Sequence, residues 1–141
     1  MKKSLTISAF LFFAILMVNC SGKKTEGSYS ANDIQGIWKA QWVTDPASYP
    51  GVDSSIEFTM DGQFEFAETG EVTISAYGHE SCIFSSDTLI HSLNWVLEND
   101  TLRLVNENDI HGMTYSVLDL STEKMKLQLM EDIFLNLTKE N

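Results

Sequence analysis

The chain has 141 residues, 43% of them hydrophobic and 21% charged, which is the size of one globular domain and excludes wholesale disorder. Its formal net charge is −11, so it repels the phosphates of nucleic acids and the headgroups of anionic lipids. These numbers weigh against nucleic-acid binding and against attachment to a membrane by charge alone.

The first 19 residues have the pattern of a secretory signal. Lys2 and Lys3 precede an uncharged apolar run from Leu5 to Val18, and polar residues follow. This run has about 14 residues, whereas a membrane-spanning helix needs roughly 20. We therefore expect a lipoprotein-type signal peptide at 1–19 rather than a transmembrane helix. Its removal takes the net charge from −11 to −13, because two lysines leave with it.

The signal ends at a cysteine whose surroundings, LMVNC at residues 16–20, resemble the lipobox of bacterial lipoproteins. The resemblance implies cleavage before Cys20 and acylation of that cysteine, for example with palmitate. It also implies a lipid anchor in the cell envelope, favouring the outer membrane of a Gram-negative bacterium, on its periplasmic or surface face. An ordinary secreted protein with a structural Cys20 is the alternative. If Cys20 is acylated, Cys82 has no partner and no intramolecular disulfide can form.

A polar tether and then a β-rich domain follow the signal. Residues 20–30 are rich in Gly, Ser and Lys and lack apolar periodicity, which is typical of a flexible tether after the lipidated cysteine. Residues 31–141 are expected to form one domain. It opens with a short helical turn that Ser30 caps and Gly36 ends.

Apolar and polar residues then alternate with a period of two, which predicts a series of short strands. The Asp61-Gly62 pair predicts a tight hairpin between strands at 54–60 and 63–66. A further strand is expected around 82–86. The side chains expected to point inward are, in chain order, Trp38, Ala40, Trp42, Ile56, Phe58, Met60, Phe64, Phe66, Val72, Ile74, Ala76, Leu89, His91, Leu93, Trp95, Leu97, Leu102, Leu104, Tyr115, Met125, Leu127 and Leu129.

Short turns join these strands consecutively, as in a β-meander. A meander of eight to ten strands buries its apolar face and loses its edges by closing on itself. The fold class is therefore all-β, an antiparallel up-and-down β-barrel of 8–10 short strands. A two-sheet sandwich is the rival fold, because alternation alone does not separate the two.

The segment Asp33-Ile34-Gln35-Gly36-Ile37-Trp38 resembles the start of the lipocalin fold. There a turn of helix precedes a Gly-x-Trp motif, and the Trp plugs the closed end of the barrel. The stretches DTLRLV at 100–105 and YSVLDLSTEKMKLQL at 115–129 are similar to small lipocalin-like bacterial lipoproteins. The resemblance covers 33–138. It implies a lipocalin-like barrel in which the loop 45–53 forms a lid over the open end.

The candidate ligand-binding residues are inward side chains of that expected barrel. His91 is in phase with apolar neighbours, so we expect it to point inward. It is either a core imidazole that hydrogen-bonds to a neighbouring residue or a polar group that orients a ligand. Because most inward residues are bulky, a solid core is the alternative to a ligand cavity. The predicted ligand-binding set is Trp42, Phe58, Phe66, His91, Trp95 and Tyr115.

Catalytic and metal signatures are weak in this sequence. The spacing of His79, His91 and His111 does not predict a zinc site, and no acidic cluster has the order of a calcium loop. No nucleophile motif such as Gly-x-Ser-x-Gly occurs. We therefore expect a protein without catalytic activity, metal or cofactor that binds a small apolar or amphipathic ligand. The alternative is a filled barrel that serves as an envelope-assembly accessory and binds an envelope protein.

Overall fold

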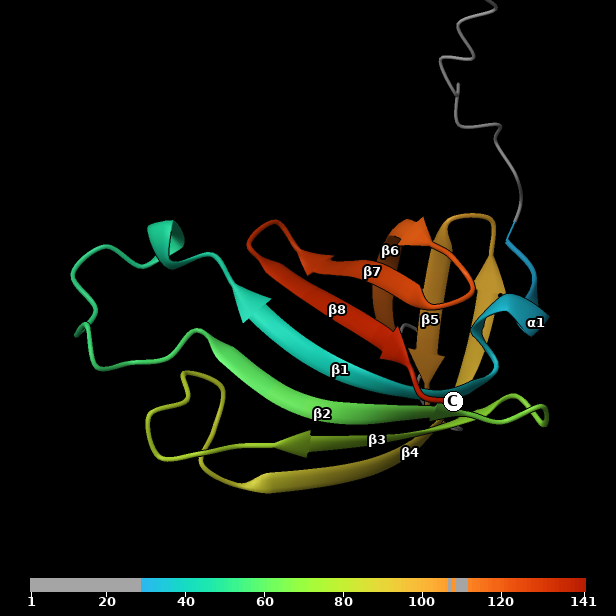
Figure 1. Cartoon of the computed structure of the whole chain (residues 1–141), viewed down its shortest axis with the longest axis horizontal. Coiled ribbons are helices and arrows are strands. Elements are labelled where there is room, and N and C mark those ends of the chain that lie inside the picture. Colours follow the sequence, from blue (N-terminus) through green and yellow to red (C-terminus); the bar gives the residue numbers. More distant parts are fainter. Residues whose placement is uncertain (1–28, 107, 109–111) are drawn as a thin grey trace, which may run out of the picture.

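The computed structural model describes residues 29–106, 108 and 112–141, and within them the chain forms a closed barrel of eight antiparallel strands (Figure 1). Each strand pairs with the next in sequence, and β8 closes the barrel on β1. The strands are β1 (Gly36–Thr44), β2 (Thr59–Phe66), β3 (Glu71–Tyr77), β4 (Thr88–Glu98), β5 (Thr101–Val105), β6 (Met113–Leu120), β7 (Lys124–Met130) and β8 (Ile133–Lys139).

This topology confirms the predicted all-β up-and-down barrel and excludes the two-sheet sandwich. The only helical segments in the described residues are the turn α1 (Ala31–Ile34) and the 3-10 turn η1 (Pro46–Ser48). None of the helices in this part of the chain is long and apolar enough to cross a bilayer. The predicted signal peptide, the lipidation site Cys20 and most of the tether lie outside the described residues.

The core follows from the alternation of the strands. In β1, β2 and β3, every second side chain is buried, so an apolar face points into the lumen and a polar face points to solvent. The same period continues in β5 and in the first half of β7. The barrel interior is therefore the hydrophobic core, as the sequence predicted.

One end of the barrel is plugged by the residue that the lipocalin resemblance singled out. Trp38 is fully buried, and its indole N–H donates to the carbonyl oxygen of Ile34 in α1 at 2.7 Å. The Lys139 ammonium lies 5.0 Å from the centroid of the Trp38 ring. The α1 turn is fixed by Asp33, whose carboxylate accepts from the backbone N–H and the hydroxyl of Ser30 at 2.8 and 3.0 Å. We call this end, with α1 and Trp38, the closed end.

The hairpin predicted at Asp61-Gly62 is wrong, because both residues lie inside the continuous strand β2. Gly62 faces the lumen between Ala40 and Ala76. A Cβ at this position would lie 2.5 Å from the Trp42 ring and would collide with the carbonyl oxygen of Ser75. The glycine therefore makes room for an indole inside the barrel and does not form a turn.

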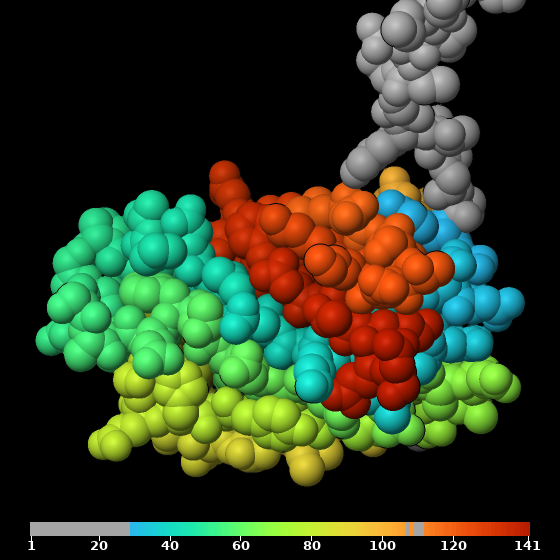
Figure 2. All heavy atoms as spheres, in the orientation of Figure 1, coloured from blue at the N-terminus to red at the C-terminus, as the bar shows by residue number. Residues whose placement is uncertain are grey.

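Two further predicted strands are loops. Residues 54–58 and 82–86 contain no strand and meet only in an isolated parallel bridge between Glu57 and Cys82. Ile56 and Phe58 alternate correctly but precede β2, so they lie outside the barrel wall and are half-buried. The loops 45–58 and 78–87 gather at the end of the molecule opposite α1 (Figure 2). We call this end the open end.

Candidate functional site

The open end contains a cavity of about 420 Å³. Seven of the eight strands contribute to its wall, and 11 of its 13 lining residues are apolar or aromatic. The two others are His91 on β4 and Asn106 just after β5. A concave apolar wall with few polar groups is the usual form of a small-molecule site.

A row of four aromatic rings crosses the barrel at and below the cavity. Trp42 packs on Phe64 with 5.5 Å between ring centroids, and Phe64 stacks on Phe66 at 5.7 Å. Phe66 meets Trp95 edge to face, also at 5.7 Å. Trp42 faces the cavity, whereas the next three rings lie below it in packed core. The row therefore separates the cavity from the filled part of the barrel.

The structure brings three of the six predicted ligand-binding residues to the cavity. Trp42, His91 and Tyr115 line it. Phe66 and Trp95 point inward as expected but lie below the cavity in packed core and do not line it. Phe58 lies in the loop before β2 and packs on Tyr49, with 6.0 Å between ring centroids.

The predicted lid does not cover the cavity, since no residue of 45–53 is among those that line it. This loop is fastened beside the mouth. The Asp45 N–H donates to the carbonyl oxygen of Asp132 at 2.8 Å. The Asp132 carboxylate, through its charge and a hydrogen bond, raises the pKa of Tyr49. The loop is thus held against the β7–β8 turn.

A loop residue that sequence reasoning missed lines the cavity instead. Phe84 belongs to the segment 78–87 between β3 and β4, and its side chain contributes to the wall. A strand was expected around 82–86, but Phe84 was not among the side chains expected to point inward, and the segment is a loop. The Ile83 N–H donates to the Glu57 carbonyl at 3.0 Å, which ties this loop to the residues before β2.

Tyr115 supplies the most buried polar group of the cavity wall. Its hydroxyl donates to the thioether sulfur of Met113 at 2.9 Å. Burial raises the pKa of Tyr115 to about 12, while a hydrogen bond with Trp42 acts in the opposite direction. The phenol therefore stays protonated at neutral pH and keeps a proton to donate.

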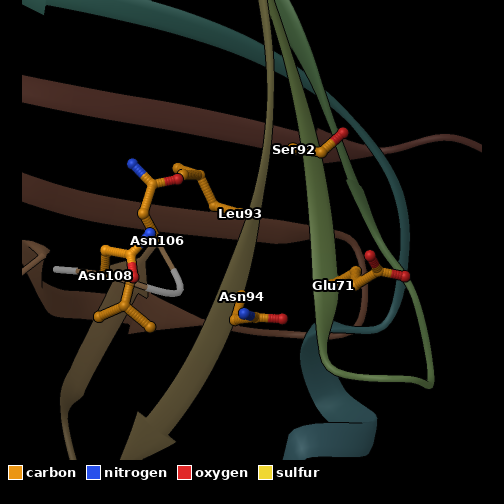
Figure 3. Close-up of a pocket in the computed structure, with 7 residues that line it drawn as sticks. Glu71, Ser92, Leu93, Asn94, Asn106 and Asn108 are labelled. Carbon is orange, nitrogen blue, oxygen red and sulfur yellow. The ribbon is translucent and has the colours of Figure 1, made fainter.

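A second and larger hollow, of about 600 Å³, lies beside β4 and shares Leu93 and Asn106 with the first cavity. It forms where β4 changes partner, pairing with β3 up to Asn94 and with β5 from Asn94 onward. Asn106 and Asn108 lie together beside Leu93, while Glu71 and Ser92 lie apart from them (Figure 3). Because its polar side chains do not converge on one point, we place the candidate site in the smaller apolar cavity.

His79 joins a carboxylate and a hydroxyl near the mouth. Its Nε2 lies 3.4 Å from the Glu57 carboxylate, and its Nδ1 lies 3.2 Å from the Ser81 hydroxyl. The adjacent backbone N–H groups of Glu57, Cys82 and Ile83 already donate to carbonyl oxygens, so they cannot serve as an oxyanion hole. The contacts therefore act as a link between two loops.

Within the described residues, no group of three His, Cys, Asp or Glu side chains could hold a metal ion. His79 and His91 belong to separate parts of the open end, since His91 lines the cavity and His79 does not. His111 lies outside the described residues.

Comparison with known proteins adds little to this geometry. No protein-family model matches the chain, and no curated protein matches it. Among solved structures, the chain is similar to a lipocalin-like protein from Bacteroides uniformis, with 16% sequence identity over 77% of this chain and 99% of that chain. The TM-score is 0.48, so this likeness carries no weight for function. The barrel assignment rests on the strand pairing of this chain itself.

Proposed function

We propose that this chain is a non-catalytic, lipocalin-like protein of the cell envelope that binds a small apolar or amphipathic ligand in the open end of its barrel. The observation that carries the proposal is the cavity of about 420 Å³ with its apolar wall. Small-molecule pockets begin at about 300 Å³, so this volume is sufficient for a ligand.

The exposure of apolar side chains in that wall to solvent supports the binding of a ligand. Leu89 on β4 and Met113 on β6 both line the cavity, yet they are 47% and 41% exposed to solvent. Apolar surface in contact with water costs about 25 cal/mol per Å², and a ligand that covers it recovers this free energy. The strands around the cavity are already paired, so binding does not have to order the backbone.

The alternative role, an envelope-assembly accessory, was predicted to accompany a filled lumen. The lumen is filled below the aromatic row and hollow above it. A hollow, apolar open end favours ligand binding over the accessory role.

The lipid anchor at Cys20 belongs to the same proposal and is supported by the lipobox resemblance at 16–20. The anchored protein would lie in the outer membrane of a Gram-negative bacterium. We expect the mature chain from its own host to begin at Cys20, with a mass that includes acyl chains. The Cys20→Ser variant should be absent from the membrane fraction. An unacylated, soluble wild-type chain would refute the anchor and leave the ligand proposal intact.

Native mass spectrometry of the protein purified from its own host tests the ligand proposal. We expect a copurifying small molecule of constant mass. Two adjacent residues of β4 provide a matched pair of variants, because Leu89 lines the cavity and Ile90, 68% exposed, does not. Neither is buried, so both variants should fold. Leu89→Asp should lose the molecule, and Ile90→Asp should retain it. A wild-type chain without a ligand, or equal retention in both variants, would contradict the proposal.

A further inference from the structure

The cavity wall carries no charged partner for an ion. Of the described residues that line it, none is lysine, arginine, aspartate or glutamate. A carboxylate that enters such a site loses its hydration and gains no cation, which is strongly unfavourable. His91 is the only imidazole in the wall, and it is exposed to water at the side of the cavity rather than buried beside Tyr115.

The rim of the open end strengthens this selection against anions. The described segments that join strands there, 45–58, 78–87 and 131–132, contain seven Asp and Glu residues and no Lys or Arg. The five cations of the described chain lie on strands instead, namely Lys39, Arg103, Lys124, Lys126 and Lys139. An anionic ligand therefore approaches a negative potential before it reaches the cavity.

Tyr115 offers a hydrogen bond that a neutral ligand can use. Its hydroxyl donates to the sulfur of Met113, which is a weak acceptor. Met113 is partly exposed, and methionine side chains adapt easily, so this sulfur can be displaced. A carbonyl oxygen in its place would be a stronger acceptor for the same proton.

From these three features we infer that the cavity selects an uncharged ligand, with a carbonyl-type oxygen that accepts from the Tyr115 hydroxyl and an apolar remainder against the wall near Leu89 and Ile133. It discriminates against carboxylates of the same chain length. This inference rests on the proposed ligand-binding function and specifies the ligand's chemical class.

Competition against N-phenyl-1-naphthylamine, a neutral fluorescent probe, tests the inference with two ligands of equal length at pH 8. We expect 2-decanone to displace the probe at a concentration at least about tenfold lower than decanoate does, because transfer of the carboxylate from water into the apolar cavity is unfavourable. Tyr115→Phe should weaken 2-decanone by about 2- to 10-fold, the range for one neutral hydrogen bond, and should weaken the probe, which has no carbonyl oxygen, by a smaller factor. Tyr77→Phe, on the outer wall, is the matched control and should change neither.

The outcomes separate this inference from the proposed function. If the probe binds and decanoate competes as well as 2-decanone, the charge selection is refuted while ligand binding stands. If Tyr115→Phe weakens the probe and 2-decanone equally, the role of the hydroxyl is refuted. If neither the probe nor either ligand binds, the proposed function fails and this inference fails with it.

Discussion

The closed and open ends of this barrel are built from the same alternating strands but are filled very differently. At the closed end, the inward side chains of Trp38, Phe64 and Leu102 are fully buried. At the open end, Leu89 and Met113 also point inward, yet they remain substantially exposed. Alternation decides only which face of a strand points inward. Whether the lumen is solid depends on which side chains meet at the same height in the barrel.

The strand pairing explains part of this difference. At the closed end, β4 pairs with β5, so its inward residues Trp95 and Leu97 face Leu104 and Leu102 across the ladder. At the open end, β4 pairs with β3 alone, and β5 ends at Val105. The wall beyond that point has fewer inward side chains from β5, and space remains above the aromatic row.

Two leucines on the same face of β7 provide the sharpest contrast in stability. Leu127 is fully buried, whereas Leu129, two residues further along, lines the cavity. We expect Leu127→Ala to lower the free energy of unfolding by about 2–5 kcal/mol, because it creates a cavity in packed core. Leu129→Ala should cost about 1 kcal/mol, since part of its surface is already exposed. Urea denaturation measures both, and equal losses would contradict the distinction between the two ends.

High pH provides the next largest effect, through Tyr115 at the boundary between the two ends. Burial raises the pKa of this phenol to about 12 from an ordinary value of 10.0. Between these two values the unfolded chain loses the proton and the folded chain keeps it. The stabilisation present below pH 10 is therefore lost as the pH rises towards 12, by about 2–3 kcal/mol.

Tyr115→Phe isolates this contribution from the other tyrosines. The difference in unfolding free energy between wild type and variant, measured by urea denaturation at pH 9 and at pH 11, should shrink as the pH rises. A difference that stays constant would mean that the phenol titrates normally in the folded chain.

Gly62 tests how closely Trp42 fits into the open end. We expect Gly62→Ala to destabilise the fold by about 1–3 kcal/mol, since the added Cβ overlaps the Trp42 ring and neighbouring backbone. It should also change the tryptophan fluorescence. Asp61→Ala, on the outer face of the same strand, should cost less than about 0.5 kcal/mol. Thermal unfolding measures the stability of both variants. A large loss of stability in Asp61→Ala alone would indicate that Asp61 and Gly62 form a turn.

The outcome at Gly62 also shows where sequence reasoning succeeds and where it stops. Met60, Phe64 and Phe66 share one parity along the chain, which fits a continuous strand. A two-residue turn at Asp61-Gly62 would pair Met60 with the next residue after the turn and would point Phe64 to the opposite face, so the apolar pattern disagreed with the turn signal. The pattern therefore predicted the inward face correctly, and the structure shows that the missing side chain of Gly62 leaves room for an indole.

The candidate site was predictable to the same limited extent. Trp42, His91 and Tyr115 were expected inside the barrel and line the cavity. Phe66 and Trp95 were also expected inside, but alternation carries no information about depth along the barrel axis, and both lie below the cavity in packed core. Phe84 comes from the segment 82–86, which was expected to be a strand and is a loop, so its place in the wall does not follow from strand alternation.

A crystal structure of the protein with N-phenyl-1-naphthylamine bound is the most direct test of the central claim, that the open end is an apolar binding cavity. We expect density for the probe above the aromatic row, in contact with Trp42 and Tyr115. A lumen filled by side chains along its whole length, with the probe absent or bound on the outer wall, would contradict it.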